Sequence, residues 1–438
     1  MTTEQFVSRF AAEFDDSQAT AQPWLQNLKR AAFDSFKQQG LPTRRQEQWK
    51  YTRIERFAVE DYRLAKAPLA LSDTLATDSL PDALALVFID GRLAAHLSTL
   101  NELPEGVQIV ELATAAKEEA TQLATAIAQY ADYQSNVFTA LNTAFLHDGL
   151  AIRLAAGVKL TQPLHLIYLH SGQQANWIAH PRIFLELFDG AELTLLEQYT
   201  PSQQSHCFIN GVTEVSLGAN AILNFSQQQA VGDDSLLINR LEVEQARDSQ
   251  FHYFNLCLGG KLVRQEVSVT LAGTGAHAQL DGFYHLNGSQ QMDLQTRVLH
   301  AVDHTTSAEH FRGIADDQAT AVFNGQIKVL PKAQKIHAQL LNKNLLLSPQ
   351  AEINTKPELE IYADDVQCSH GATIGDLDAT ALFYLQSRGL SVAAAKTLLL
   401  YAFAKQQFAA VSHASISQQL QRACMQKIDP TTHLEHIS

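Results

Sequence analysis

The chain has 438 residues and a formal net charge of −14, and 46% of its residues are hydrophobic. This length can bury a large core in two or three domains, and the acidic balance argues against binding to nucleic acid or to an anionic membrane. No stretch of sequence is apolar for long enough to cross a bilayer, and the opening MTTEQFVSRF lacks the layout of a secretory signal. We therefore expect a cytoplasmic protein.

The cysteines are few and widely separated. No two of them form a CxxC pair, and a secreted disulfide framework would space them more densely. We expect reduced thiols, some of them in the core, at Cys207, Cys257, Cys368 and Cys424.

Apolar residues recur at helical spacing early in the chain, at Leu25, Leu28, Ala32 and Phe36. Gly40 ends this segment, and the Ala-, Gln- and Leu-rich residues 112–146 also predict helix. A short strand is expected between them, from Leu84 to Ile89. Residues 1–148 are therefore predicted to form a mainly helical N-terminal region.

From about Ala151 the pattern changes to short β-rich runs such as RIFLELF, TEVSL and EVSVTL, with no long helical pattern for some two hundred residues. Many short strands separated by polar or glycine turns are typical of an all-β sandwich, barrel or solenoid. The β core is predicted over residues 149–374.

The spacing of the turns favours a solenoid. Gly190-Ala191 and Gly218-Ala219 lie 28 residues apart, and Gly275-Ala276 follows 57 residues later. One coil without this signature fits the gap and would turn near Ala246-Arg247. Such a period is typical of the stacked coils of a parallel β-helix. Because Gly-Ala is a common turn pair, the spacing alone leaves a sandwich open as the alternative.

Helical patterns return after Gly375 and define a C-terminal helical domain at residues 375–438. Gly389 fits the position that ends one helix, and Ser391 fits the N-cap of the next. That next helix contains LLLYAFA at 398–404, which is apolar on nearly every side. It is either core of a larger helical domain or a surface for a partner.

Cys368 and His370 form the most informative pair for chemistry. On an extended strand they share one face with Val366, so a thiolate and an imidazole could both contact a soft metal ion or a cluster edge. Two ligands are half of a tetrahedral site, and the others must come from elsewhere in the fold or from another chain. The alternative is that both side chains are packed and hydrogen-bonded in the last coil.

A second group contains His300, Asp303, His304 and His310, in which His300 and His304 would share a strand face. We favour surface histidines around a turn over a metal site here. No phosphate-binding GxxxxGK[ST] loop, GxSxG elbow or HExxH motif occurs in the sequence, so it shows no active site of its own.

Three blocks of the C-terminal half resemble the SufB/SufD family of iron–sulfur cluster assembly proteins: FRGIADDQATAVFNGQIKV, AQLLNKNLLLSPQAEINTKPELEIYADDVQCSHGATIG and LFYLQSRGL. The N-terminal QEQWKYT, residues 46–52, is similar to a family motif too. The CSHGATIG stretch and the modest length resemble the D type. The B type is usually longer and has a Glu-rich variant at residues 369–371.

The resemblance implies a mainly β fold, with a right-handed parallel β-helix core flanked by N- and C-terminal α-helical regions. It also implies a complex with a SufB-type paralogue and two copies of a SufC-type ABC ATPase. The chain would be a non-catalytic accessory subunit that supports iron entry and nascent cluster formation at the interface with the paralogue. Cys368 and His370 match the family positions near that interface.

By the same resemblance the C-terminal helices dock the ATPase, with candidate contacts at Leu382, Phe383, Leu385, Leu399, Tyr401 and Phe403. No cofactor would be bound stably by this chain alone, iron or a cluster would be transient in the complex, and a flavin in the complex stays open. So does a homodimer of the isolated chain, because an open β-helix edge invites pairing. Two alternatives remain, a purely structural partner and a β-helix polysaccharide-processing enzyme.

Overall fold

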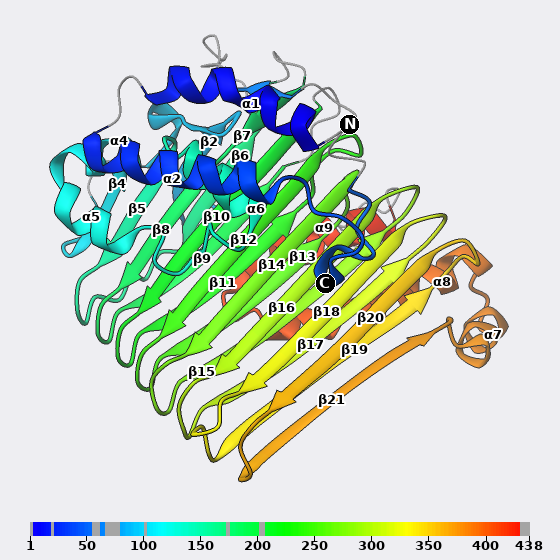
Figure 1. Cartoon of the computed structure of the whole chain (residues 1–438). Coiled ribbons are helices and arrows are strands. Elements are labelled where there is room, and N and C mark those ends of the chain that lie inside the picture. The colour runs from blue at the N-terminus through cyan, green and yellow to red at the C-terminus, as the bar shows by residue number, and fades with distance from the viewer. Residues whose placement is uncertain are drawn as a thin grey trace.

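The computed structural model describes residues 3–18, 22–54, 62–65, 79–99, 103–171, 176–200 and 206–429. Two large sheets, called sheet A and sheet B, face each other across one interior, and the chain alternates between them coil after coil (Figure 1). Successive strands of each sheet pair in parallel, for example β10 with β12 and β11 with β13. The fold is therefore mainly β, a parallel β-helix with helical regions at the N- and C-termini of the chain, as expected.

Sheet A contains, starting from the C-terminal side, β20 (Glu352–Ile361), β18 (Thr320–Val329), β16 (Gln291–His300), β14 (Leu262–Leu271), β12 (Leu236–Gln245), β10 (Cys207–Leu217), β8 (Arg182–Leu187), β5 (Gly149–Leu154) and β4 (Val107–Glu111), with β7 (Trp177–Ala179) and β1 (Arg63–Leu64) joined beside β10. Sheet B contains β21 (Val366–Gly375), β19 (Ile336–Leu346), β17 (Thr306–Ala315), β15 (His277–Leu286), β13 (Gln250–Cys257), β11 (Ile222–Gln229), β9 (Glu192–Tyr199), β6 (Leu164–Leu169), β2 (Leu84–Ile89) and β3 (Arg92–Leu93).

The predicted turns all lie where a strand of sheet A passes to the next strand of sheet B. Gly190 and Gly275 have φ angles of 70° and 79°, a left-handed conformation that glycine adopts at little cost. Asp248 takes the same conformation, with φ of 56°, in the coil without a Gly-Ala signature. This turn joins β12 to β13, so the coil predicted near Ala246-Arg247 is confirmed.

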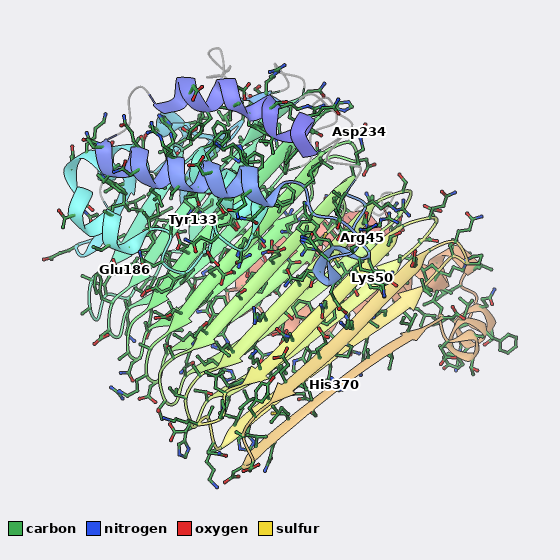
Figure 2. The ribbon with its side chains drawn as sticks, in the orientation of Figure 1. Arg45, Lys50, Tyr133, Glu186, Asp234 and His370 are labelled. Atoms are coloured by element: carbon green, nitrogen blue, oxygen red, sulfur yellow. The ribbon has the colours of Figure 1, made fainter. Side chains whose placement is uncertain are left out.

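The coils stack in chain order, so one end of the β-helix is N-terminal and the other is C-terminal. Figure 2 shows Glu186, on β8, near the first end and His370, on β21, in the last coil. Side chains that face inward form ladders through the stack. One ladder in sheet A runs through Val215, Val243, Val269 and Val298.

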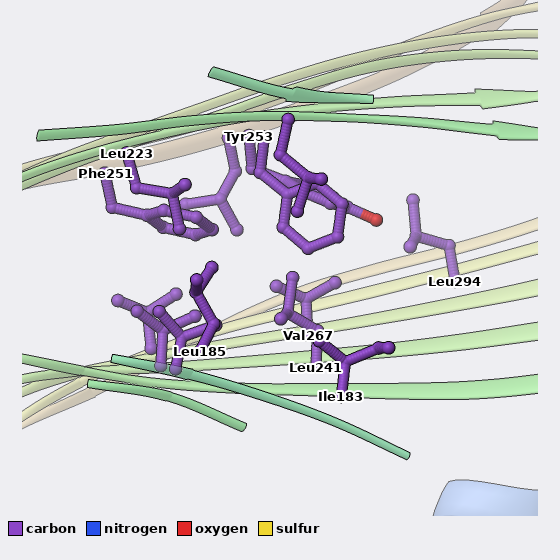
Figure 3. Close-up of a cluster of buried hydrophobic side chains, with 14 of the residues drawn as sticks. Ile183, Leu185, Leu223, Leu241, Phe251, Tyr253, Val267 and Leu294 are labelled. Carbon is purple, nitrogen blue, oxygen red and sulfur yellow. The ribbon is translucent and has the colours of Figure 1, made fainter. Parts of the chain in front are cut away.

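The interior is packed with aliphatic and aromatic side chains from both sheets. Figure 3 shows part of this core, in which Leu223 and Phe251 of sheet B face Leu185 and Leu241 of sheet A. Burying one such side chain stabilises the fold by about 1.5–3 kcal/mol, so the repeated ladders hold the coils together.

Helices cover the outer faces of the two sheets. In the N-terminal region these are α1 (Thr3–Gln18), α2 (Pro23–Gln39), α4 (Leu112–Glu118), α5 (Ala120–Ala126) and α6 (Val137–Ala144), with short 3₁₀ helices η1 (Glu47–Trp49) and η2 (Ala95–Leu97). Phe36 and Phe138 pack with Phe208 and Leu236 of sheet A. Strand β2 belongs to sheet B and strand β4 to sheet A, so the N-terminal region is continuous with the β-helix.

The C-terminal helices are α7 (Ala379–Ser387), α8 (Val392–Lys405), η3 (Gln407–Ala410) and α9 (Ala414–Ile428). Leu400 and Phe408 pack against Phe254 and Phe283 on the outer face of sheet B. Within the described ranges, no helix combines the length and the apolar character needed to cross a bilayer.

The helix expected over 112–146 is instead three short helices, α4, α5 and α6. The break after α5 has a physical cause. The carboxylate of Glu214 accepts hydrogen bonds from the backbone N–H groups of Ala128, Tyr130 and Ala131, at 2.9–3.1 Å. These amides are therefore satisfied outside a helix, and Ala128 adopts a φ of 60°.

Candidate functional site

The last coil leaves the β-helix with an open end. Its strands, β20 and β21, are the terminal strands of sheets A and B, and each pairs with one neighbour, β18 or β19 (Figure 1). Among the described residues no further strand covers the outer edges of β20 and β21. Such unpaired edges offer backbone N–H and C=O groups to another chain.

Cys368 and His370 both lie in the inward-facing row of β21. Cys368 is in register with Ala338 of β19, and His370 with Leu340, and both partners are buried in the interior. The alternation predicted from sequence therefore places thiol and imidazole on one side of the strand. Because no coil follows, Cys368 is half-buried and His370 is exposed (Figure 2).

The two side chains differ in their surroundings. Cys368 packs against the interior core, and this burial raises the pKa of its thiol. A thiol must lose its proton to bind a metal, so the partly buried Cys368 needs a metal or a positive group to favour the thiolate. His370 reaches solvent and offers an imidazole nitrogen.

Over the described part of the chain, no three His, Cys, Asp or Glu side chains are grouped so that they could hold a metal ion. Cys368 and His370 therefore supply two donors at most. A sulfur and an imidazole nitrogen suit iron or a cluster edge, but a complete set of four ligands needs donors from outside these residues.

The open end also carries exposed apolar side chains that the sequence did not single out. Tyr362 follows β20 and is 59% exposed, and Ile361 and Ile374 are also exposed. Ile361 and Ile374 continue the alternating apolar pattern of β20 and β21, which resembles that of a buried strand. Only the position of their strands at the end of the stack leaves these residues uncovered.

Helix α7 ends and helix α8 begins as predicted. The Ser391 hydroxyl accepts a hydrogen bond from the N–H of Ala394, and Gly389 has a φ of 95°. Asp378 caps α7 in the same manner through the N–H of Thr380. Local sequence therefore determines where the helices of the α7–α8 hairpin, which follows β21, begin and end.

The six apolar residues proposed to dock the ATPase differ in exposure. Phe383 is 72% exposed, and Leu382, Leu385, Leu399 and Tyr401 are intermediate. Phe403 instead packs on the chain itself, against Phe283 and the guanidinium of Arg312. The sequence reasoning missed further exposed apolar residues beside Phe383, namely Tyr384, Leu390, Val392 and Leu398.

The second histidine group does not form a site, and its expected arrangement is wrong in two respects. His300 is buried rather than on the surface, and its ring bonds the hydroxyls of Thr305, at 2.7 Å, and Ser307, at 3.0 Å. Burial lowers the pKa of His300 to about 4. His304 lies in a turn with φ of 55°, so it does not share a strand face with His300.

The remaining cysteines are separate, buried and free, as expected for core thiols. Burial raises the pKa to about 12 for each of Cys207, Cys257 and Cys424. Thiols held so firmly in the protonated form are poor nucleophiles and poor ligands. Cys368 is the cysteine that retains access to solvent.

Two family models match almost the whole chain. Residues 1–166 match the SufBD protein N-terminal region, and residues 169–403 match the SufBD core domain of the SUF system of FeS cluster assembly. The boundary between the two matches falls within the first coils of the β-helix, near β6.

Three similar curated proteins align over most of their lengths. An iron–sulfur cluster assembly SufBD family protein of Synechocystis is 33% identical, with 92% of this chain and 90% of that protein covered. The iron–sulfur cluster assembly protein SufD of Escherichia coli is 30% identical, with 95% and 94% covered. SufD of Bacillus subtilis is 24% identical, with 87% and 88% covered.

Proposed function

The chain belongs to the SufBD family of iron–sulfur cluster assembly proteins, and we propose that it is the SufD-type accessory subunit of a scaffold that also contains a SufB-type paralogue and a SufC-type ABC ATPase. The observation that carries the proposal is a thiol and an imidazole on one face of a strand at an uncovered edge, where they could supply half of a metal site. Cys368 and His370 face inward in a coil that nothing among the described residues closes.

In this proposal the paralogue pairs with the open end and supplies the missing ligands. Paired edges would satisfy the free backbone groups of β20 and β21 and cover the exposed Tyr362 and Ile374. Iron or a nascent cluster is the cargo, held transiently between the chains. His370 is the first contact for iron, because it reaches solvent, and Cys368 follows once a positive charge favours its thiolate.

The ATPase docks, in this proposal, on the exposed apolar face of α7 and α8 around Phe383. An exposed aromatic side chain of this kind commonly anchors a protein interface. Because α7 follows β21 directly, movement imposed on the hairpin would reach the strand that carries Cys368 and His370. The chain itself performs no catalytic step, and a flavin, if the assembly uses one, belongs to the complex.

A cytoplasmic location fits this role, because free thiols persist where the compartment is reducing. Isolated from its paralogue, the chain would pair its own open edges and form a homodimer.

The decisive experiment uses the complete complex of this chain with the paralogue and the ATPase. Reconstitution of the cluster without oxygen, followed by iron and sulfide determination, should give much lower loading with His370→Ala, while the complex still assembles. His337→Ala is the matched control, because His337 is also exposed on sheet B but lies in the outward-facing row of β19. Equal loading of both variants would refute the metal role.

One observation favours a second candidate function, that of a purely structural partner. Cys368 packs against the interior core, so its thiol can be explained by packing alone. In that case Cys368→Ala would lower stability without affecting the cluster, and His370→Ala would have no effect on either. The reconstitution experiment separates the two functions.

A further inference from the structure

Glu309, on β17, is buried in the interior without a hydrogen bond of full geometry. Its side chain has no solvent exposure, and neither carboxyl oxygen has a well-aligned partner among the described residues. The hydroxyl of Thr296, on the opposite sheet, interacts with the acid and is itself otherwise without a partner. Buried polar groups in native proteins are nearly always satisfied, so an acid with one hydroxyl near it in an apolar core requires an explanation.

The position of Glu309 relates it to the open end. It is in register with Leu340 of β19, and Leu340 is in register with His370 of β21. Neighbouring strands lie about 4.8 Å apart, so a single layer of side chains separates the acid from the uncovered coil. On its other side Leu280 and Tyr253 continue the same ladder into the closed interior.

Leu340 covers Glu309 on the side of the open end. It reaches across the interior to Gly325 of β18, where a Cβ atom would stand 2.3 Å from a Leu340 methyl carbon. Gly325 therefore makes room for Leu340, and Gly325 is itself in register with Thr296. The layer above Glu309 thus depends on one flexible side chain packed onto a glycine.

No positive charge in the interior compensates the acid, and His310, on the outer face of β17, acts on it only weakly. The other ionisable side chains that face inward on β15 to β21 are Tyr284, His300, Cys368 and His370. Burial keeps His300 neutral, with a pKa of about 4, and raises the pKa of Tyr284. On the outer faces of the neighbouring strands, His310 pairs with Asp281 at 3.4 Å.

Burial raises the pKa of Glu309 to about 7, against weaker lowering effects of Thr296 and His310. The carboxyl group is therefore neutral in the closed interior at mildly acidic pH. The ionised carboxylate must be hydrated. The shortest route for water to reach it runs from the open end past Leu340.

We propose that Glu309 is a proton-dependent latch on the open end of the β-helix: protonated, it stays sealed beneath Leu340, and when it releases its proton to solvent, water enters and β19 and β21 loosen. The latch does not rest on the role proposed for Cys368 and His370, because it concerns the opening of strands. It does bear on that site, since both residues lie on one of the strands that loosen.

The test is hydrogen–deuterium exchange of the full chain between pH 6 and pH 8, corrected for the intrinsic exchange rate. The closed state binds the proton of Glu309 more tightly than the open state does. Low pH therefore stabilises the closed state, and raising the pH removes this stabilisation. The opening equilibrium of β19 and β21 should therefore rise about tenfold over this range in the wild type. In Glu309→Gln, which carries no proton to lose, it should stay constant.

Glu360→Gln is the matched control, because Glu360 lies on the last coil of sheet A but is paired with Lys328 at the surface. This variant should keep the wild-type pH dependence. Glu309→Met serves as a second variant in case the glutamine does not fold, and it should also be independent of pH. The latch is refuted if the glutamine or methionine variant retains the tenfold change, or if the wild type shows none in β19 and β21.

Discussion

Arg182 and Glu214 form an ion pair in which neither side chain has any solvent exposure. The two residues lie on the neighbouring strands β8 and β10 of sheet A, and both reach the N-terminal region. Arg182 donates a hydrogen bond to the side-chain oxygen of Asn142, at 3.0 Å, and Glu214 holds the backbone that follows α5. The pair therefore fastens the N-terminal region to the first coils of the β-helix.

Breaking this pair should be costly. Glu214→Gln removes the charge that compensates a fully buried guanidinium, which typically destabilises a protein by about 3–5 kcal/mol. Denaturant unfolding monitored by circular dichroism measures the loss. Glu192→Gln is the control, because the pair between Glu192 and Lys159 is exposed and should contribute less than about 1 kcal/mol. Similar losses for both variants would contradict this assignment.

The QEQWKYT motif has a structural role. The ring of Trp49 packs on Phe138 and stacks under the guanidinium of Arg264, whose central carbon lies 3.9 Å from the ring centroid. Arg264 is buried and pairs with Asp293, which also accepts a hydrogen bond from Thr52. The motif thus holds an N-terminal segment onto the outer face of sheet A.

Trp49→Ala should destabilise the protein by about 3–5 kcal/mol, because it leaves a cavity and removes the stacking partner of a buried cation. Exchange of the backbone amides of residues 46–54 should increase with it. Tyr51→Ala, in the same motif but at a position that is 39% exposed, should change stability by less than about 0.5 kcal/mol. Equal effects at the two positions would show that the motif acts in another way.

The fold could be predicted further than the site. Turn spacing located the coil near Ala246-Arg247 because each coil must return the chain to the same edge. It was harder to predict which residues of each strand face inward. Apolar residues such as Phe254 and Phe283 also face outward, where the C-terminal helices cover them. Strands that are buried on both faces lose the alternation that marks an inner face.

The inward position of Glu309 could not be predicted from the sequence. In TSAEHFRGIA an acidic residue between Ala308 and His310 looks like a surface position, and only the register with Leu280 and Leu340 places it inside. For Cys368 and His370 the shared face followed from strand alternation alone. Their position at an uncovered edge depends on which strand ends each sheet, and this is a property of the whole topology.

Phe383 and Phe408 should respond differently to substitution, although both lie in the C-terminal helical part. Phe408 is buried against Phe254 and Phe283, so Phe408→Ala should cost about 3–5 kcal/mol of stability. Phe383→Ser should leave stability unchanged within about 0.5 kcal/mol, because the side chain is 72% exposed, but it should weaken binding of the ATPase. Unfolding curves and calorimetric titration measure the two effects. Unchanged ATPase affinity in Phe383→Ser would argue against docking at this surface.

Cys368 should be the only thiol of the folded chain that reacts quickly with a thiol reagent. The other three cysteines are buried, with pKa values raised to about 12, whereas Cys368 is half-buried at the open end. Because burial also raises the pKa of Cys368, its rate should climb about tenfold per pH unit through pH 8 rather than level off. Cys368→Ser should abolish the fast reaction. Unfolding the chain in urea should make the three buried thiols react quickly as well. If the paralogue covers the open end, adding it should slow the reaction of Cys368, whereas a rate that does not change would place that interface elsewhere on the molecule.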